Sequence, residues 1–120
     1  MYLEVRRNKY NAQKTVFGNR KYDSKHEAGV AQDIDLLRKS GEVVEVYPQK
    51  TFALYGKNGS KVGQWRADFL LTFKDGHQEV IEAKGLESHA FRFQRNLFVD
   101  NYPDILLTIV KGKQWTPYRH

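Results

Sequence analysis

The stretch 65–85, WRADFLLTFKDGHQEVIEAKG, constrains the fold most, because it contains two strand-like segments and a short turn. Residues 65–73 are rich in Phe, Leu and Thr, and residues 78–84 have Val and Ile at their centre. Both compositions are typical of β-strands. Between them, residues 74–76 end in Gly76, which readily takes the positive φ angle of a tight turn. We therefore predict a β-hairpin in the middle of the chain.

Three charged residues, Asp68, Glu82 and Lys84, interrupt this apolar hairpin. Because side chains alternate along a strand, Glu82 and Lys84 point to the same face. The position of Asp68 depends on the length of the turn. A two-residue loop places Asp68 opposite Ala83, whereas a three-residue loop with Gly76 in the left-handed conformation places it opposite Glu82.

Two opposed carboxylates on one face repel each other, and a cation between them would relieve the repulsion. Asp and Glu oxygens are hard ligands that suit Mg²⁺. The ammonium of Lys84 would then be placed to stabilise an anion beside the metal. The alternative is a surface hairpin whose outer face carries ordinary solvated charges.

Length and composition limit the possible classes of protein. A chain of 120 residues forms one domain by size, and no apolar run reaches the roughly 18 residues that a membrane span needs. The chain has no cysteine, which excludes disulfides and thiolate chemistry and fits a reducing cytoplasm. A net charge of +6 favours an anionic partner, with nucleic acid ahead of a membrane surface.

The positive charge is concentrated at the start of the chain. Residues 1–25 contain seven basic residues against Glu4 and Asp23, with aromatic residues among them. This mixture suits phosphate contacts combined with base or sugar packing. We predict a basic arm over residues 1–22, with a small hairpin around Gly18-Asn19; the alternative is a solvated arm without a ligand. The candidate DNA-binding residues are Arg6, Arg7, Lys9, Lys14, Arg20, Lys21 and Lys25.

The remaining elements follow from periodicity and turn signals. A helix is predicted over residues 23–40 and a largely buried helix over 88–101, with Ser24 as the N-cap of the first and Gly41 just past its end. Residues 42–55 are extended with a bend at Pro48, and Asn58-Gly59 predicts a two-residue hairpin loop that pairs Lys57 with Ser60. Residues 105–110, ILLTIV, predict a buried strand. The order of elements is α-β-β-β-α-β.

The segment Asp68, followed after the turn by Glu82-Ala83-Lys84, resembles the D…(E/D)-x-K core of the PD-(D/E)XK nuclease superfamily. The motifs KYNAQKT, KYDSKHEA, ADF, EAKG and FRFQRNLF are similar to those of small bacteriophage proteins in this superfamily, some of whose relatives resemble the archaeal Hjc Holliday junction resolvases. Ala67 replaces the proline of the motif, a position that is commonly relaxed in the superfamily.

The resemblance implies an α/β (α+β) restriction-endonuclease-like core, a mixed sheet flanked by helices. It divides the chain into a basic arm (1–22), a nuclease core (23–113) and a C-terminal tail (114–120). In the tail, Trp115 and Tyr118 have three possible roles: covering the core, stacking on DNA or joining a dimer interface.

The resemblance also implies an active site built around Mg²⁺, with Mn²⁺ as a substitute. The implied metal ligands are Asp68, Glu82, the backbone carbonyl of Ala83, and Glu27 from the first helix. Lys84 would orient or deprotonate water or balance the developing charge, and Gln94 on the second helix is a further catalytic candidate. Glu27 has an alternative role, because Ser24-Lys25-His26-Glu27 matches a helix-capping box.

We therefore expect a Mg²⁺-dependent, structure-selective DNA endonuclease in the cytoplasm, the host cytoplasm if the protein comes from a phage. The resemblance favours a homodimeric Holliday junction resolvase, because two symmetric cuts need two active sites. One alternative is a nuclease or nickase without junction preference. The other is a basic DNA-binding module in which the carboxylates are only structural.

Overall fold

The computed structural model describes residues 3–7, 13–17, 20–22, 25–85 and 87–119. The chain divides into two compact units, Met1–Glu42 and Val43–His120, which are described separately below. The division into arm, core and tail that the sequence suggests stays a prediction. No helix in the described part of the chain is long and apolar enough to cross a membrane.

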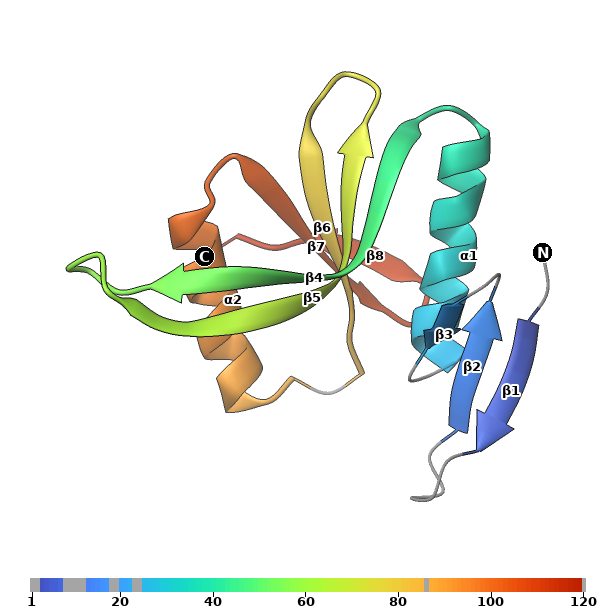
Figure 1. Ribbon diagram of the computed structural model, residues 1–120, viewed down its shortest axis with the longest axis horizontal. Coiled ribbons are helices and arrows are strands. Elements are labelled where there is room, and N and C mark those ends of the chain that lie inside the picture. Colours follow the sequence, from blue (N-terminus) through green and yellow to red (C-terminus); the bar gives the residue numbers. More distant parts are fainter. Residues whose placement is uncertain (1–2, 8–12, 18–19, 23–24, 86, 120) are drawn as a thin grey trace. The chain divides into compact units, whose positions relative to one another are not determined.

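The first unit contains a three-stranded antiparallel sheet and one helix (Figure 1). The strands are β1 (Leu3–Arg7), β2 (Gln13–Phe17) and β3 (Arg20–Tyr22), and the helix is α1 (Lys25–Lys39). Phe17 pairs with Arg20, which confirms the predicted hairpin, although its turn and the proposed N-cap Ser24 lie outside the described residues.

Helix α1 ends as its sequence predicts. Gly41 has a φ angle of +87°, and its N–H donates to the carbonyl of Arg38. The N–H of Glu42 donates to the carbonyl of Leu37. These two bonds form a Schellman motif, which needs a left-handed residue just past the helix and therefore favours glycine.

The second unit is a five-stranded mixed sheet with one helix. Its elements are β4 (Val43–Tyr55), β5 (Lys61–Phe73), β6 (Gln78–Ala83), α2 (His89–Asn101), β7 (Ile105–Lys111) and β8 (Gln114–Pro117). The strands lie in the order β4-β5-β6-β7-β8, with β6 and β7 parallel and the other neighbours antiparallel. The predicted α+β class and the α-β-β-β-α-β order are confirmed, and β8 lies within the predicted tail.

Strands β4 and β5 both change direction near their middles (Figure 1). At the middle of β4, Gln49 has a φ angle of +57°, directly after Pro48, where the sequence predicts a bend. The β4–β5 pairing continues on both sides of this point. In contrast, the β5–β6 register reaches only to Phe69 and Ile81. Strand β5 therefore separates from β6 at the bend.

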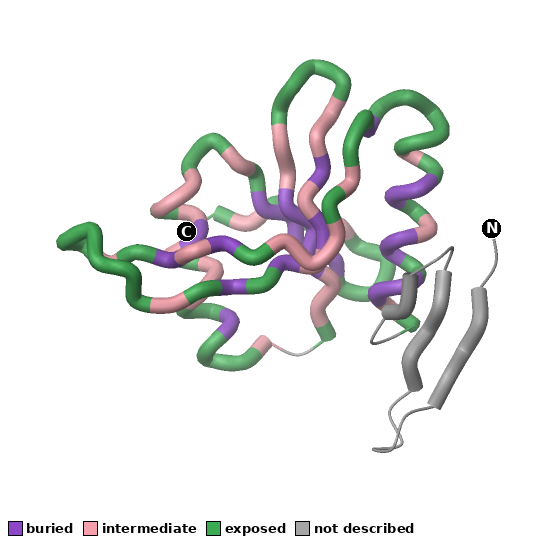
Figure 2. The backbone as a smooth tube through the Cα atoms, in the orientation of Figure 1, coloured by how far each residue is buried: buried purple, intermediate pink, exposed green. Residues whose placement is uncertain are grey.

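Helix α2 covers an aromatic core on the sheet. The helix begins at the N-cap Ser88, whose Oγ accepts a hydrogen bond from the N–H of Phe91. Phe98 contacts Phe52 and Trp65, with ring centroids 4.9 and 5.1 Å apart. Burying aromatic side chains contributes about 1.5–3 kcal/mol each, so this cluster holds α2 on the sheet. The buried residues of this cluster are Phe52, Leu54, Trp65, Ala67, Val80, Phe91, Phe98, Leu107 and Ile109. Figure 2 shows buried stretches on the strands of the sheet and on α2.

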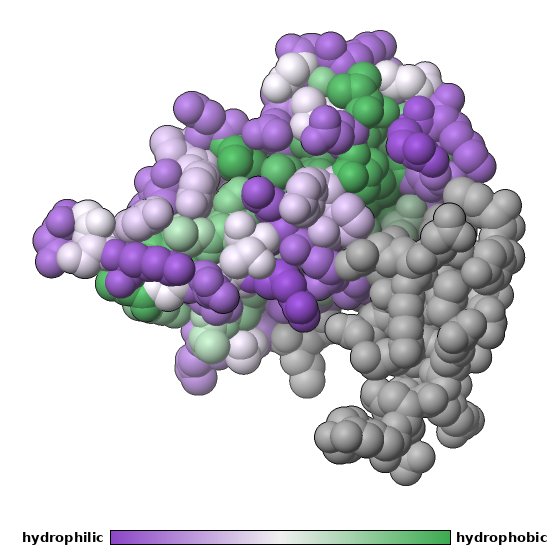
Figure 3. Space-filling model, viewed as in Figure 1, coloured by the Kyte–Doolittle hydropathy of each residue, from purple (hydrophilic) through white to green (hydrophobic). Residues whose placement is uncertain are grey.

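Helix α2 is less buried than the sequence analysis predicts. Phe91 and Phe98 are buried, but Phe93 is 63 % exposed and Ala90 is also exposed. Ala90 and Phe93 face solvent, whereas Leu97 packs partly against the core. Figure 3 shows hydrophobic patches between hydrophilic areas on the drawn face of the second unit.

Two loops in the sheet have the same three-residue geometry. In the loop 74–76, the N–H of Phe73 donates to the carbonyl of His77, and the N–H of Gly76 donates back to Phe73. In the loop 57–59, Gly56 pairs in the same way with Ser60. The predicted two-residue loop with Lys57 paired to Ser60 is therefore wrong. Each loop ends in a left-handed glycine, with φ angles of +94° at Gly76 and +81° at Gly59.

Replacement of Gly76 by Ala tests the turn on which the hairpin register depends. No neighbouring atom would meet the new Cβ, so the cost is the left-handed φ angle itself, and we expect a loss of about 1–2 kcal/mol in unfolding free energy. Gly29→Ala is the matched control. Gly29 lies in α1 without a positive φ angle, and there Ala stabilises by about 0.5–1 kcal/mol. Urea unfolding measures both values, and equal effects of the two variants would contradict the assignment.

Candidate active site

The turn at residues 74–76 sets the register that brings Asp68 and Glu82 together. Phe69 pairs with Ile81 and Leu70 with Val80, so the next position along places Asp68 opposite Glu82. Of the two registers that the sequence allowed, the structure has the one with the three-residue loop. The two carboxylates predicted to share a site are therefore direct cross-strand neighbours.

The carboxylates occupy the place where β5 separates from β6. The backbone N–H of Asp68 donates to Oε1 of Glu82 at 3.0 Å. In return, the backbone N–H of Ala83 donates to Oδ2 of Asp68 at 2.8 Å. We call this reciprocal arrangement the carboxylate clasp. It provides side-chain acceptors for two amides just beyond the end of the regular β5–β6 ladder.

Lys84 completes the cluster from the end of β6. Its Nζ lies 3.0 Å from Oε2 of Glu82 and 4.3 Å from the ring centroid of Phe91 on α2. Its backbone N–H donates to the carbonyl of Val110, which extends the β6–β7 pairing by one residue. The lysine is therefore fixed at its backbone and at its ammonium, while 26 % of its side chain remains exposed.

Glu82 lies in an environment that disfavours its charge. Its side chain is only 3 % exposed. Burial, and secondly the charge of Asp68, raise the pKa of Glu82 from its ordinary 4.5 to about 7, although the ammonium of Lys84 acts in the opposite direction. One lysine thus offsets only part of the cost of burying this carboxylate beside a second one.

The chemistry of the clasp fits a hard divalent cation. It presents two carboxylates from adjacent strands, and a bound cation would lower the cost of charging Glu82. Ala83, the predicted carbonyl ligand, follows Glu82 directly on β6. Within the described residues, no group of three or more His, Cys, Asp or Glu side chains could hold a metal. A metal at the clasp would therefore need further ligands such as backbone carbonyls, water or substrate oxygens.

The two site candidates on helices are Glu27 on α1 and Gln94 on α2. Glu27 is buried in the first turn of α1, which belongs to the first unit. Its approach to the carboxylates and its capping bond to Ser24 both stay predictions. Gln94 donates to the carbonyl of Gln64 at 3.4 Å. Gln64 lies four residues before Asp68 on β5, so the structure does not bring Gln94 to the clasp.

The predicted DNA-binding residues lie mostly on the strands of the first unit. Arg6 and Arg7 belong to β1, Lys14 to β2, and Arg20 and Lys21 to β3. Lys25 is the first residue of α1, and Lys9 lies outside the described residues. Their contact with DNA stays a prediction.

Sequence reasoning missed two features beside the clasp. Phe91 supports the Lys84 ammonium, although its spacing on α2 indicated only a core residue. Gln49 takes the left-handed conformation on β4, between the residues that pair with Phe69 and Ala67. Glutamine has no preference for that conformation, so only the preceding proline hinted at an irregular backbone.

Comparison with known proteins gives one match. A family model described as "Protein of unknown function (DUF1064)" matches residues 7–117. Neither the curated proteins nor the solved structures contain a match.

The pKa of Glu82 predicts how stability changes with pH in the presence of EDTA. Because the pKa of Glu82 is higher in the folded protein than in the unfolded chain, protonation of Glu82 stabilises the fold. This stabilisation is fully present below pH 4.5 and is lost as pH rises through about 7. Between pH 5 and 8 we expect wild-type protein to lose about 2–3 kcal/mol more stability than Glu82→Gln. Urea unfolding at both pH values measures this difference. Parallel losses in the two proteins would show that Glu82 does not titrate abnormally.

Proposed function

The chain belongs to the DUF1064 family of proteins of unknown function, and we propose that it is a metal-dependent DNA endonuclease of the PD-(D/E)XK type. The observation that carries this proposal is the carboxylate clasp with Lys84 beside it. Asp68 and Glu82 converge at the point where two strands separate, and the lysine amine lies within 3.0 Å of one carboxylate. Clustered acids with a fixed cation suit chemistry on a phosphodiester.

The residues of the clasp have separate tasks in this proposal. Asp68 and Glu82 would hold Mg²⁺, with the carbonyl of Ala83 and Glu27 as further candidate ligands. When bound, the metal would make water more acidic and stabilise negative charge on the phosphate. Lys84, fixed between Glu82 and Phe91, would hold the attacking water or balance the charge that develops on the phosphate oxygens. Hydrolysis then forms a bond between the water oxygen and phosphorus and breaks the bond between phosphorus and one sugar oxygen. The attacking water gives up a proton, and the leaving sugar oxygen takes up a proton to become a hydroxyl.

The substrate that we propose is branched DNA, with a four-way junction as the preferred form. The net charge of +6 and the basic residues on β1, β2 and β3 favour a nucleic acid partner. The preference for a junction comes from the resemblance to Hjc-type resolvases. It requires a homodimer, because paired cuts across a junction need two active sites. The absence of cysteine is compatible with action in the cytoplasm.

A structural role for the carboxylates is the second candidate. Each carboxylate accepts a hydrogen bond from a backbone amide of the other strand, and these bonds link β5 to β6 just beyond their regular pairing. In that case the protein would be a basic DNA-binding module without catalysis. This candidate does not account for the choice of two acids, since Asn and Gln side chains accept the same hydrogen bonds without mutual repulsion.

Cleavage of an immobile four-way junction and of linear duplex with the same sequence tests the proposed function. We expect wild-type protein to make paired nicks in the junction with Mg²⁺ and none with EDTA. Glu82→Gln should lose at least about 100-fold in rate, because it removes a charge that the metal needs. Glu79→Gln is the matched control, since Glu79 lies on the same strand but bonds to Thr108.

The outcomes of this assay separate the hypotheses. Cutting of both DNAs would leave a nuclease without junction preference. Tight binding of both DNAs without any cutting would favour the binding module. Wild-type rates in Glu82→Gln would remove the clasp from the reaction.

Lys84→Met removes the charge of the lysine while keeping an unbranched side chain. The ammonium beside Glu82 and over the ring of Phe91 is lost. We expect a loss of about 100-fold or more in the single-turnover cleavage rate, with DNA affinity changed less than about threefold. The charge-matched control is Lys57→Met on the exposed loop 57–59, which should cleave normally. A near-normal rate in Lys84→Met would exclude the proposed role of the lysine.

A further inference from the structure

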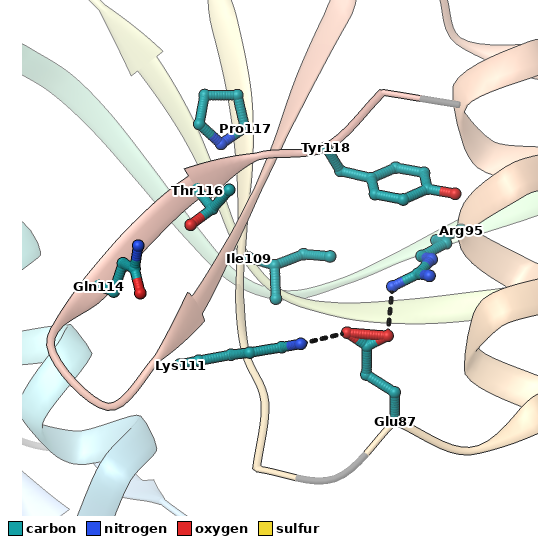
Figure 4. Close-up of a pocket in the computed structure, with 8 residues that line it drawn as sticks. All are labelled: Glu87, Arg95, Ile109, Lys111, Gln114, Thr116, Pro117 and Tyr118. Atoms are coloured by element: carbon teal, nitrogen blue, oxygen red, sulfur yellow. Dashed lines mark hydrogen bonds and ion pairs between the residues drawn. The ribbon is translucent and has the colours of Figure 1, made fainter.

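A second group of charged residues lines a cavity on the α2 side of the sheet. The cavity has a volume of about 400 Å³ and lies between α2, the segment before it, and strands β7 and β8 (Figure 4). Its polar lining residues are Glu87, Arg95, Lys111, Gln114, Thr116 and Tyr118. None of these residues belongs to the carboxylate clasp.

The ion pairs of this cavity leave a surplus of positive charge. Glu87 lies 2.6 Å from Nη1 of Arg95 and 2.6 Å from Nζ of Lys111, with Nε of Arg92 at 3.9 Å. The bond from Lys111, and also that from Arg95, hold the pKa of Glu87 below its usual range, although burial acts in the opposite direction. One ionised carboxylate therefore faces three cations.

Arg95 is held in place by aromatic rings as well as by Glu87. Its Cζ lies 4.3 Å from the ring centroid of Tyr118 and 5.5 Å from that of Phe91. The side chain is 15 % exposed, and its Nε is buried without a hydrogen-bond partner. Its hydrogen bond to Glu87 runs through Nη1 alone, so this bond uses only part of the fork that a guanidinium offers to an oxyanion.

The cavity is close to the proposed active site. Lys84 and Arg95 contact the same ring of Phe91, at 4.3 and 5.5 Å from its centroid, so their cationic groups are at most about 10 Å apart. Lys111 follows Val110, whose carbonyl accepts the N–H of Lys84. Each nucleotide advances a DNA strand by about 3.4 Å along the helix axis, and the backbone also winds around this axis. Phosphates within about 10 Å of each other on one strand are therefore at most about three nucleotides apart.

We propose that this cavity binds a backbone phosphate of the DNA strand, one to three nucleotides from the phosphate at Lys84. Arg95 and Lys111 are its charged donors, Gln114 and Thr116 supply neutral hydrogen bonds, and Glu87 is displaced from the two cations when the phosphate enters. The identity of the ligand as DNA depends on the proposed function, but the binding of phosphate does not require cleavage.

Two substitutions with opposite expected effects test this site. Lys111→Gln removes a donor and should weaken binding about tenfold, whereas Glu87→Gln removes the competing carboxylate and should strengthen it several-fold. Their controls carry the same charge changes on exposed residues elsewhere, Lys57→Gln and Asp33→Asn. The probes are inorganic phosphate and 5′-phosphorylated dithymidine, in EDTA. Nitrogen-15 NMR of the Arg95 Nε–H reports binding at the cavity.

The proposal predicts that the Arg95 signal shifts with both probes. Relative to their controls, Lys111→Gln should bind the probes more weakly and Glu87→Gln more tightly. Cavity variants that match their controls, or an Arg95 signal that does not shift, would overturn it. Thr116→Val should weaken binding about threefold and provides a test in a variant that keeps all ion pairs.

Junction cleavage with the same variants separates the two proposals. Phosphate binding in the predicted pattern, by a protein that cleaves no DNA, would leave the phosphate site standing and remove the nuclease. Normal cleavage with an unchanged KM in Lys111→Gln would remove the phosphate site and leave the nuclease.

Discussion

The reciprocal hydrogen bonds between Asp68 and the Glu82-Ala83 segment are the interaction on which the centre of the second unit depends. Strand β5 stays paired with β4 through the bend, but its register with β6 ends at Phe69. A buried amide without a partner costs free energy comparable to a lost hydrogen bond. The carboxylate clasp avoids this cost at both strands, and as a consequence it places a half-buried acid, Asp68, beside a buried one, Glu82.

The clasp alone does not require acids, and this is the main argument for a function. Neutral amide side chains would bond to the same two backbone N–H groups without placing one negative charge beside another. The protein instead has two carboxylates and a lysine, with the pKa of Glu82 raised to about 7. Departures from locally favourable chemistry of this kind concentrate at functional sites. A cation that offsets the repulsion, and a phosphate beside Lys84, would explain all three residues together.

The cavity proposed to bind phosphate lies near the carboxylate clasp, and cation–aromatic contacts connect the two. Lys84, Phe91 and Arg95 form a continuous series of cation–aromatic contacts, which ends at Tyr118 on the chain after β8. Tyr118 packs against the core, and its backbone N–H donates to Leu107, which continues the β7–β8 pairing by one residue. Its ring lies beside the guanidinium of Arg95. Of the three roles that the sequence left open for Tyr118, packing on the core is the one that these contacts support.

Much of the fold could be predicted from the sequence, because its local signals agree with one another. Gly41 and Ser88 mark helix ends correctly, and the apolar run 105–110 marks a strand, although Leu106 within it is 49 % exposed. The length of hairpin loops could not be predicted, since a left-handed glycine suits both two-residue and three-residue loops. The sequence left both lengths open at residues 74–76 and favoured the wrong one at Asn58-Gly59.

The site was only partly predictable for a related reason. Alternation along strands identifies residues that share a face, and it placed Glu82 and Lys84 together. It does not reveal where strands separate. Pro48 predicted a bend in β4, but the separation of β5 from β6 and the hydrogen bonds of Asp68 appear only in three dimensions. On α2, the family resemblance suggested Gln94 as a site residue. In the structure Gln94 bonds to Gln64, and Phe91 is the residue of α2 that contacts Lys84.

The most direct test of the central claim is calorimetric titration of the metal-free protein with Mg²⁺, comparing wild type with Glu82→Gln and Glu79→Gln. If Asp68 and Glu82 form a cation site, wild type and Glu79→Gln bind Mg²⁺ with a saturable heat, and Glu82→Gln does not. Equal heats in all three proteins, or no binding by wild type, would mean that the carboxylate clasp only joins two strands.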